Sequence, residues 1–178
     1  MSHASDMRLW PRLALFAAAA TLLFLFERAL PNPLPFFRLG LANVVTLIVL
    51  LAHGFRAAAW VLLLRLLLGG FFAGTLLGPQ FLLATAGSAA SLVVMAVAAQ
   101  FGARIWSPLG ISVLGATTHA VAQLVVVAAL FAAGQGVFLL LPLFVGMALL
   151  TGTCTGVVAD IVLARLDLAT RTAPERSP

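Results

Sequence analysis

Six long apolar segments, separated by short polar or Pro/Gly-rich interruptions, occupy most of this chain. They lie at residues 13–26, 39–52, 57–77, 81–101, 111–131 and 137–163. A membrane-spanning helix needs roughly 20 mostly apolar residues, and the first two segments reach that length only by including residues 10–12 and 36–38. None shows the alternating polarity of a membrane barrel strand. The pattern predicts an all-α polytopic membrane protein, with six transmembrane helices in a single domain over residues 1–178.

The composition excludes a soluble enzyme. Hydrophobic residues make up 63% of the chain and charged residues only 8%, whereas a soluble domain carries about a quarter charged residues. A cleaved signal peptide would place small residues after its apolar run, but residues 17–20 are small and lie in the middle of the first segment. We therefore expect this segment to remain as a membrane span.

The basic residues indicate the orientation of the chain. All ten are Arg, and with five acids they give a formal net charge of +5. Seven flank alternate ends of the apolar segments: Arg8, Arg12, Arg56, Arg104, Arg165, Arg171 and Arg176. Because positively charged loops stay in the cytoplasm, we expect both termini inside, with cytoplasmic tails at residues 1–9 and 167–178 of a multi-pass protein of the cell inner membrane. No nucleic-acid partner is expected. The positions of the other three arginines, Arg28, Arg38 and Arg65, are not explained by the orientation of the chain.

Small residues recur at a spacing of four in several segments, which lets helix backbones approach closely. The sets are Ala14 and Ala18, Gly70, Gly74 and Gly78, Ala116 and Ala120, and Gly152 and Gly156. We interpret this spacing as internal packing between helices, with a docking face for another subunit as the alternative.

The longest external connection, residues 27–38, contains three prolines that disfavour helix, Pro31, Pro33 and Pro35. This segment is either a lid over a site or a stiff spacer.

A few polar residues lie inside the apolar segments, where hydrocarbon should exclude them. Arg65 stands roughly 12 Å from the inner boundary at 1.5 Å per residue, and a charge there costs about 2.5–3.5 kcal/mol. His119 and Gln123, four residues apart, share one helix face, and Ser88 and Ser91 mark a face of the fourth segment. We expect such groups to surround a polar cavity. The predicted substrate-binding residues are Arg38, Asn43, Arg65, Ser88, His119 and Gln123.

The charge of Arg65 requires a counter-charge, and two explanations are open. The guanidinium either pairs with Glu27 or Asp160, or snorkels toward water, which makes it structural. Otherwise the counter-charge is an anionic ligand, such as a carboxylate or phosphate, for which a guanidinium fork is well suited. His119 is likewise either a structural hydrogen-bonding residue or a ligand contact. No Cys or acid stands at metal-site spacing from it, so no metal and no cofactor is expected.

The sequence lacks the motifs of the obvious enzymes. There is no Gly-rich phosphate loop ending in Lys and Ser or Thr, and no Gly-Xaa-Ser-Xaa-Gly elbow of a serine hydrolase. The five acids are scattered, whereas magnesium-dependent prenyl transfer needs carboxylates that hold the metal. We expect a protein that is not itself an enzyme.

Three stretches of this sequence together resemble a known family. They are Arg38-Leu39-Gly40-Leu41-Ala42-Asn43, the Arg65 helix with Gly69, Gly70, Gly74 and Thr75, and Ser107-Pro108-Leu109-Gly110-Ile111-Ser112 followed by Gly115-Ala116, His119 and Gln123. The chain resembles the Gx transporter family, also labelled heptaprenyl diphosphate synthase component I, over residues 13–163. That family is similar to the S components of energy-coupling-factor transporters, six-helix proteins that capture a small molecule outside.

The resemblance implies an S-component-like bundle that works with a coupling transmembrane subunit and two ATPases. The Ala14 and Ala18 spacing resembles the face with which S components meet the coupling subunit. The family's second label implies a different class of function, an accessory non-catalytic membrane subunit of polyprenyl diphosphate metabolism with a prenyl diphosphate synthase partner. A structural subunit without a ligand is a third reading. The residues alone leave a vitamin, a carboxylate and a diphosphate open as ligands.

Overall fold

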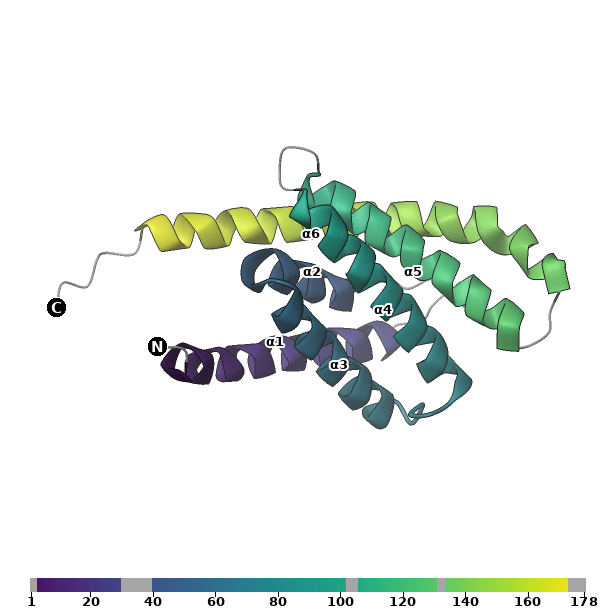
Figure 1. Ribbon diagram of the computed structural model, residues 1–178, viewed down its shortest axis with the longest axis horizontal. Helices are drawn as coiled ribbons and strands as arrows, with labels where there is room; N and C mark the ends of the chain where they lie inside the picture. The colour runs from purple at the N-terminus through teal and green to yellow at the C-terminus, as the bar shows by residue number, and fades with distance from the viewer. Residues whose placement is uncertain (1–2, 30–39, 102–105, 131–133, 173–178) are drawn as a thin grey trace.

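The structure is a computed structural model, which describes residues 3–29, 40–101, 106–130 and 134–172. Within these ranges the chain is helical and contains no strand (Figure 1). The helices are α1 (His3–Ala29), α2 (Leu41–His53), α3 (Phe55–Phe72), α4 (Pro79–Gln100), α5 (Pro108–Leu130), the short 3-10 helix η1 (Gly134–Leu140) and α6 (Leu141–Thr172). The predicted all-α polytopic fold is confirmed, and the six apolar segments correspond to α1 to α6.

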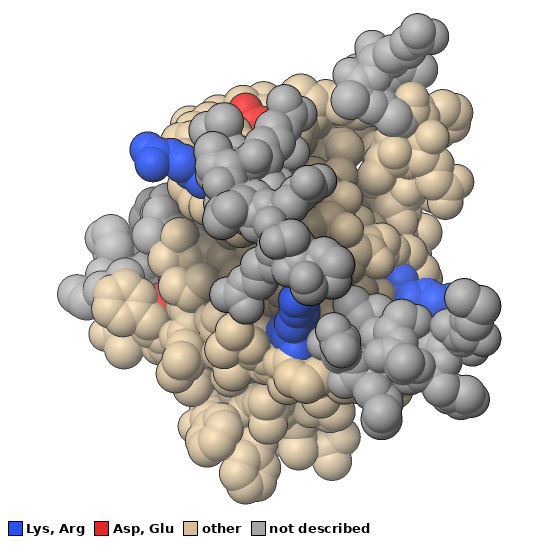
Figure 2. Space-filling view, turned by 90° about the vertical axis from the view of Figure 1, so that its left-hand side faces the viewer, with Lys and Arg blue, Asp and Glu red and all other residues tan. Residues whose placement is uncertain are grey.

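Five helical segments are long and apolar enough to cross a membrane, and the chain is a multi-pass membrane protein. They lie at Trp10–Ala29, Phe55–Phe72, Pro79–Gln100, Pro108–Leu130 and Gly136–Leu166. The beginning of α1 and the end of α6 lie toward the same end of the bundle (Figure 1). That end carries basic side chains on its surface (Figure 2), and Arg12 and Arg56 are exposed. This arrangement is the one that the loop arginines predict for cytoplasmic termini.

The second helix differs from the expected transmembrane length. α2 has 13 residues, which at 1.5 Å per residue is about 20 Å, short of the roughly 30 Å of a hydrocarbon core. Its apolar side chains from Val44 to Leu50 are buried, and α2 contacts α1, α3 and α6. Since other helices surround it, its length is set by protein contacts rather than by lipid. Gly54, with φ +84°, is the single residue between α2 and α3.

The third helix ends earlier than its apolar sequence predicts. The apolar segment continues to Leu77, whereas α3 ends at Phe72. The chain then turns through Gly74 and Leu77, which have φ values of +64° and +63°. Helix α4 begins at Pro79, where a missing N–H costs nothing. This turn places the start of α4 beside the end of α3.

The α5–α6 contact is a glycine-mediated seam, as the spacing of small residues predicts. A Cβ at Gly152 would lie 2.8 Å from Cα of Val113, and one at Gly156 would lie 2.7 Å from Cα of Leu109. Here the backbones touch closely, and the internal-packing interpretation is confirmed. For helix α1 the internal-packing interpretation is wrong, because Ala14 and Ala18 lie on the exposed face of the helix. The buried face of α1 carries other residues, including Leu13, Ala17, Ala20 and Thr21.

Candidate functional site

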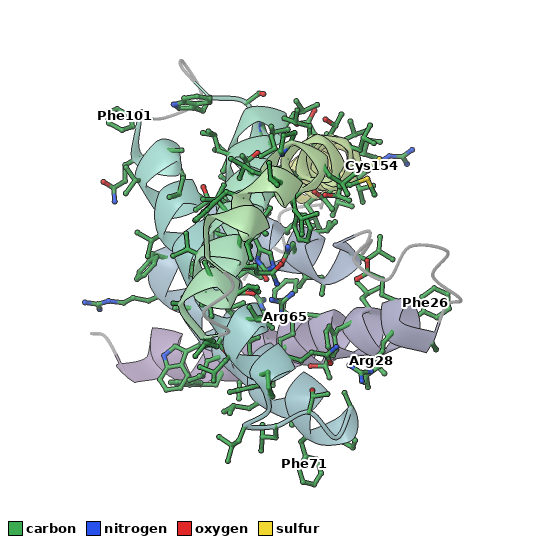
Figure 3. All side chains as sticks on the ribbon, turned by 90° about the vertical axis from the view of Figure 1, so that its right-hand side faces the viewer. Phe26, Arg28, Arg65, Phe71, Phe101 and Cys154 are labelled. Carbon is green, nitrogen blue, oxygen red and sulfur yellow. The ribbon has the colours of Figure 1, made fainter. Side chains whose placement is uncertain are left out.

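Arg65 lies in the interior of the bundle. It stands ten residues after the first residue of α3, about 15 Å along the helix axis, and its side chain is only 7% exposed. Figure 3 looks at the end opposite the termini and shows Arg65 near the centre of the bundle. The guanidinium of Arg65 is therefore enclosed by other helices, as expected for a charge within an apolar segment.

Two neutral side chains hold the ends of the Arg65 guanidinium. Nη1 donates a hydrogen bond to Oδ1 of Asn43 on α2, at 3.1 Å. Nη2 donates to Oγ of Ser88 on α4, also at 3.1 Å. Residues from three helices, all expected at one site, are thus brought together. Both bonds fix the orientation of the guanidinium without neutralising its charge.

The third nitrogen of this guanidinium is buried and has no hydrogen-bond partner among the described residues. Nε of Arg65 is inaccessible to solvent and forms no hydrogen bond within that part of the chain. A guanidinium carries five N–H donors, and the two bonds given for Nη1 and Nη2 use two of them. A buried donor left unsatisfied costs about 1–3 kcal/mol, and more when it is charged. This side of Arg65 is consequently suited to an additional acceptor.

His119 and Gln123 of α5 pack against α4 next to Ser88. A Cβ at Gly87 would lie 2.9 Å from Cε1 of His119 and 3.1 Å from Cγ of Gln123. Because Gly87 has no side chain, α5 can pack closely against α4 at this point. The next residue of α4, Ser88, is a hydrogen-bond partner of Arg65. His119 and Gln123 thus contact α4 at the residue that precedes Ser88.

Ser91 lies on the same helix but faces a different neighbour. It is 4% exposed, and a Cβ at Gly115 would lie 3.0 Å from its Oγ. Its contact is therefore with α5 one turn further along α4. Arg38 and the proline-bearing residues 30–39 lie outside the described residues, so neither the role of Arg38 nor the lid or spacer reading is addressed by this structure.

The two acids considered as partners of Arg65 occupy different positions. Asp160 on α6 is exposed and is not buried beside Arg65, so that pairing is wrong. Glu27 on α1 is 6% exposed, accepts a hydrogen bond from the backbone N–H of Gly40, and acts electrostatically on Arg65. The hydrogen bonds given for the guanidinium still go to neutral groups.

A cavity of about 30 Å³ adjoins Arg65 on the side opposite the termini. It lies between the last turns of α1, the second half of α3 and the first turns of α4, and its lining residues are Phe24, Arg28, Arg65, Leu66, Gly70, Thr75, Gln80, Phe81 and Ala84. Arg28, which topology leaves unexplained, is one of them. Sequence reasoning did not place Thr75 or Gln80 at the site, because Thr75 falls in a segment predicted to remain helical to Leu77 and Gln80 lies between two segments.

The chemistry available around Arg65 is that of binding. The described groups are a buried cation, an amide, a hydroxyl and, one helix further, an imidazole and a second amide, from Asn43, Ser88, His119 and Gln123. These groups donate and accept hydrogen bonds at fixed positions. An anion in the adjoining cavity would find a preoriented guanidinium whose Nε still lacks an acceptor.

A comparison with known protein families matches most of the chain. The family model described as heptaprenyl diphosphate synthase component I matches residues 16–162. No curated protein and no solved structure matches the chain. The matched residues extend from the first membrane segment into α6 and include every described residue of the Arg65 site, so the chain belongs to the heptaprenyl diphosphate synthase component I family.

Proposed function

We propose that this protein is a membrane substrate-binding subunit of the S-component type, which takes up a small anionic molecule. Separate coupling and ATPase subunits supply the energy, and the protein itself catalyses no reaction. The single observation that carries the proposal is the buried guanidinium of Arg65, whose Nε has no hydrogen-bond partner among the described residues and which borders a cavity.

The energetics of Arg65 favour a ligand over a purely structural role. Burying a cation inside a membrane bundle costs several kcal/mol unless its charge and donors are matched. Asn43 and Ser88 supply acceptors but no charge, and the buried carboxylate of Glu27 acts on Arg65 electrostatically rather than through either of these two hydrogen bonds. An anionic ligand in the adjoining cavity completes the donor set. In this account Asn43 and Ser88 position Arg65, and Arg65 touches the ligand.

The location of the cavity supports uptake from the outside. The cavity lies near the end of the bundle opposite both termini, so cytoplasmic termini place it toward the external face of the inner membrane. A ligand arriving there reaches Arg65 before it passes the midplane. Release on the other side requires rearrangement of the subunit, which is the role proposed for the coupling and ATPase partners.

The family name favours one second candidate. The chain would then be an accessory, non-catalytic membrane subunit of polyprenyl (heptaprenyl) diphosphate metabolism, partnered by a prenyl diphosphate synthase subunit. A diphosphate is an anion that Arg65 could also bind. The two candidates therefore share the binding chemistry and differ in the partner.

Purification of the full-length protein from its native membranes in mild detergent separates the two candidates. Mass spectrometry of the copurified proteins should find a transmembrane coupling subunit and ATPases, and genes for such subunits should neighbour this one. A copurified prenyl diphosphate synthase, with no ATPase, would replace the uptake proposal by the second candidate. Arg65→Gln serves as the ligand-site control, because it should leave the partner subunits unchanged while abolishing anion binding.

A further inference from the structure

Two arginines from different helices border the same small cavity. Arg65 reaches it from α3 and Arg28 from the last turn of α1, and the described residues that line it include no acid. Figure 3 shows Arg65 near the centre of the bundle and Arg28 toward its edge. The cavity therefore runs from a buried cation to an exposed one.

The beginning of α4 adds a third source of positive potential. Gln80 and Phe81, in the first turn of this 22-residue helix, line the cavity. Pro79 has no N–H and the N–H of Phe81 donates to the carbonyl of Gly78 at 3.0 Å, so the first-turn donor for an anion is the N–H of Gln80. The N-terminus of a long helix carries a partial positive charge and backbone N–H donors, which bind phosphate and other anions. Arg65 lines the same cavity, and its buried Nε has no hydrogen-bond partner among the described residues.

The contact that closes the cavity mouth is weak. Nη1 of Arg28 donates to Oε1 of Gln80 at 3.4 Å, at the exposed surface between α1 and α4. Typical N–H···O bonds measure about 2.7–3.2 Å, and an ionised acceptor adds to the hydrogen bond a charge–charge attraction that a neutral amide lacks. An incoming anion therefore competes effectively with Gln80 for Arg28.

From these three features we infer that the cavity binds a phosphate-type headgroup, held between the guanidinium groups of Arg28 and Arg65 and the N-terminus of α4. This inference rests on the proposed anion-binding function and specifies its ligand class. A phosphate has three peripheral oxygens and up to two negative charges, so it can accept from all three donors at once. A carboxylate has two oxygens and one charge, and leaves one of the two arginines without a partner.

The size of the cavity limits what enters it. Its volume is small, about 30 Å³, and the contact between Arg28 and Gln80 lies at its mouth. Binding consequently separates Arg28 from Gln80, and only the headgroup enters. The remainder of the ligand lies outside, on a molecule that is either water-soluble or a membrane lipid.

Isothermal titration of the purified full-length protein in detergent at low ionic strength tests this inference, with inorganic phosphate and acetate as probes. The wild type should bind phosphate at least about tenfold more tightly than acetate, because the phosphate contacts a second guanidinium. Arg28→Gln should remove that preference while changing acetate affinity less than about twofold. Arg65→Gln should abolish binding of both anions, and the exposed inner arginine Arg56, changed to Gln, is the matched control that should change neither.

The outcomes separate this inference from the proposed function. If Arg28→Gln leaves the phosphate preference intact while Arg65→Gln abolishes binding, the two-arginine site is overturned and the anion-binding function stands. If the Arg65→Gln variant also binds phosphate like the wild type, both the two-arginine site and the proposed anion-binding function are contradicted. Native mass spectrometry in nanodiscs containing phosphatidic acid identifies the source of the headgroup. An adduct of this lipid that depends on Arg28 indicates a membrane ligand, whereas binding of inorganic phosphate alone indicates a soluble one.

Discussion

The α5–α6 seam and the α1–α3–α4 region use glycine in the same way but reach different results. At the seam, Gly152 and Gly156 bring the backbones into contact, and the buried hydroxyls of Ser112 and Thr155 satisfy each other at 2.7 Å. Between α3 and α4, a Cβ at Gly70 would lie 3.0 Å from the ring of Phe81, yet a cavity remains beside the unpartnered Nε of Arg65.

This difference separates packing from binding. Interhelical contacts in a membrane depend on close packing and on satisfied polar groups, because lipid competes equally well for apolar surface. The seam meets both requirements among its described residues and contributes stability. The Arg65 region leaves a charged donor unsatisfied, and so stability alone does not account for its composition. The two regions should therefore respond to mutation in opposite ways.

The largest expected effect is at the seam. Gly156→Leu places a side chain where Cα of Leu109 already lies 2.7 Å from the would-be Cβ, so α5 and α6 must separate. Overpacking of a well-packed contact costs about 1–3 kcal/mol, and a clash with backbone should exceed that range. Thermal unfolding in detergent should show a strongly lowered Tm or no folded protein.

Gly146 on the same helix provides the matched control for this prediction. Nothing lies within 4 Å of a Cβ placed there, so Gly146→Leu should unfold close to the wild-type temperature. Equal losses in the two variants would mean that the seam is not specially close-packed.

A smaller effect, on binding rather than stability, is expected from the residues that orient Arg65. Asn43→Ala and Ser88→Ala each remove one acceptor of its guanidinium, which lets the charged group rotate. Hydrogen bonds to charged groups contribute about 1.5–3 kcal/mol, so phosphate affinity should fall about tenfold or more in each variant. Titration calorimetry measures the affinity, and a cooperative unfolding transition shows that the bundle remains folded, at a Tm lowered by the unsatisfied donor of Arg65. A large fall in Tm with unchanged affinity would assign both residues to packing.

The smallest effect concerns the hydroxyl pair of the seam. Thr155 Oγ1 also lies 2.9 Å from the carbonyl of Thr151, so Thr155 donates within its own helix and Ser112 donates to Thr155. Hydrogen bonds between membrane helices contribute about 0.6 kcal/mol on average. Ser112→Ala, Thr155→Val and the double variant should therefore give a coupling energy of about that size in a double-mutant cycle. A coupling near zero would indicate that the hydroxyls merely pack against each other.

The sequence predicts the helices and the polar residues inside them for one reason: hydrocarbon excludes charge and exposed backbone. That reason places Asn43, Arg65, Ser88, His119 and Gln123 within the apolar segments. The structure joins the first three by hydrogen bonds and packs the other two against Gly87 of α4. It does not reveal the length of α2, because an apolar sequence shows only that water is excluded, not whether lipid or protein replaces it.

The positions of the residues at the outer end of the cavity could not be predicted from the exclusion of charge by hydrocarbon. The end of α3 depends on Gly74 in a positive-φ conformation, within a sequence whose apolar character continues past it. That turn positions Gln80 beside Arg28, a residue 52 positions away in the chain. Arg28 could be recognised from the sequence only as an arginine that topology does not explain.

The most direct test of the account is native mass spectrometry of the protein purified from its own membranes without added ligand. The wild type and Arg56→Gln should carry the same bound anion, seen as a mass adduct that collisional activation releases, and Arg65→Gln should lack it. Two results would contradict the claim that Arg65 is the anion receptor. The first is ordinary membrane phospholipid as the sole adduct of the wild type and both variants, and the second is retention of the anion by Arg65→Gln.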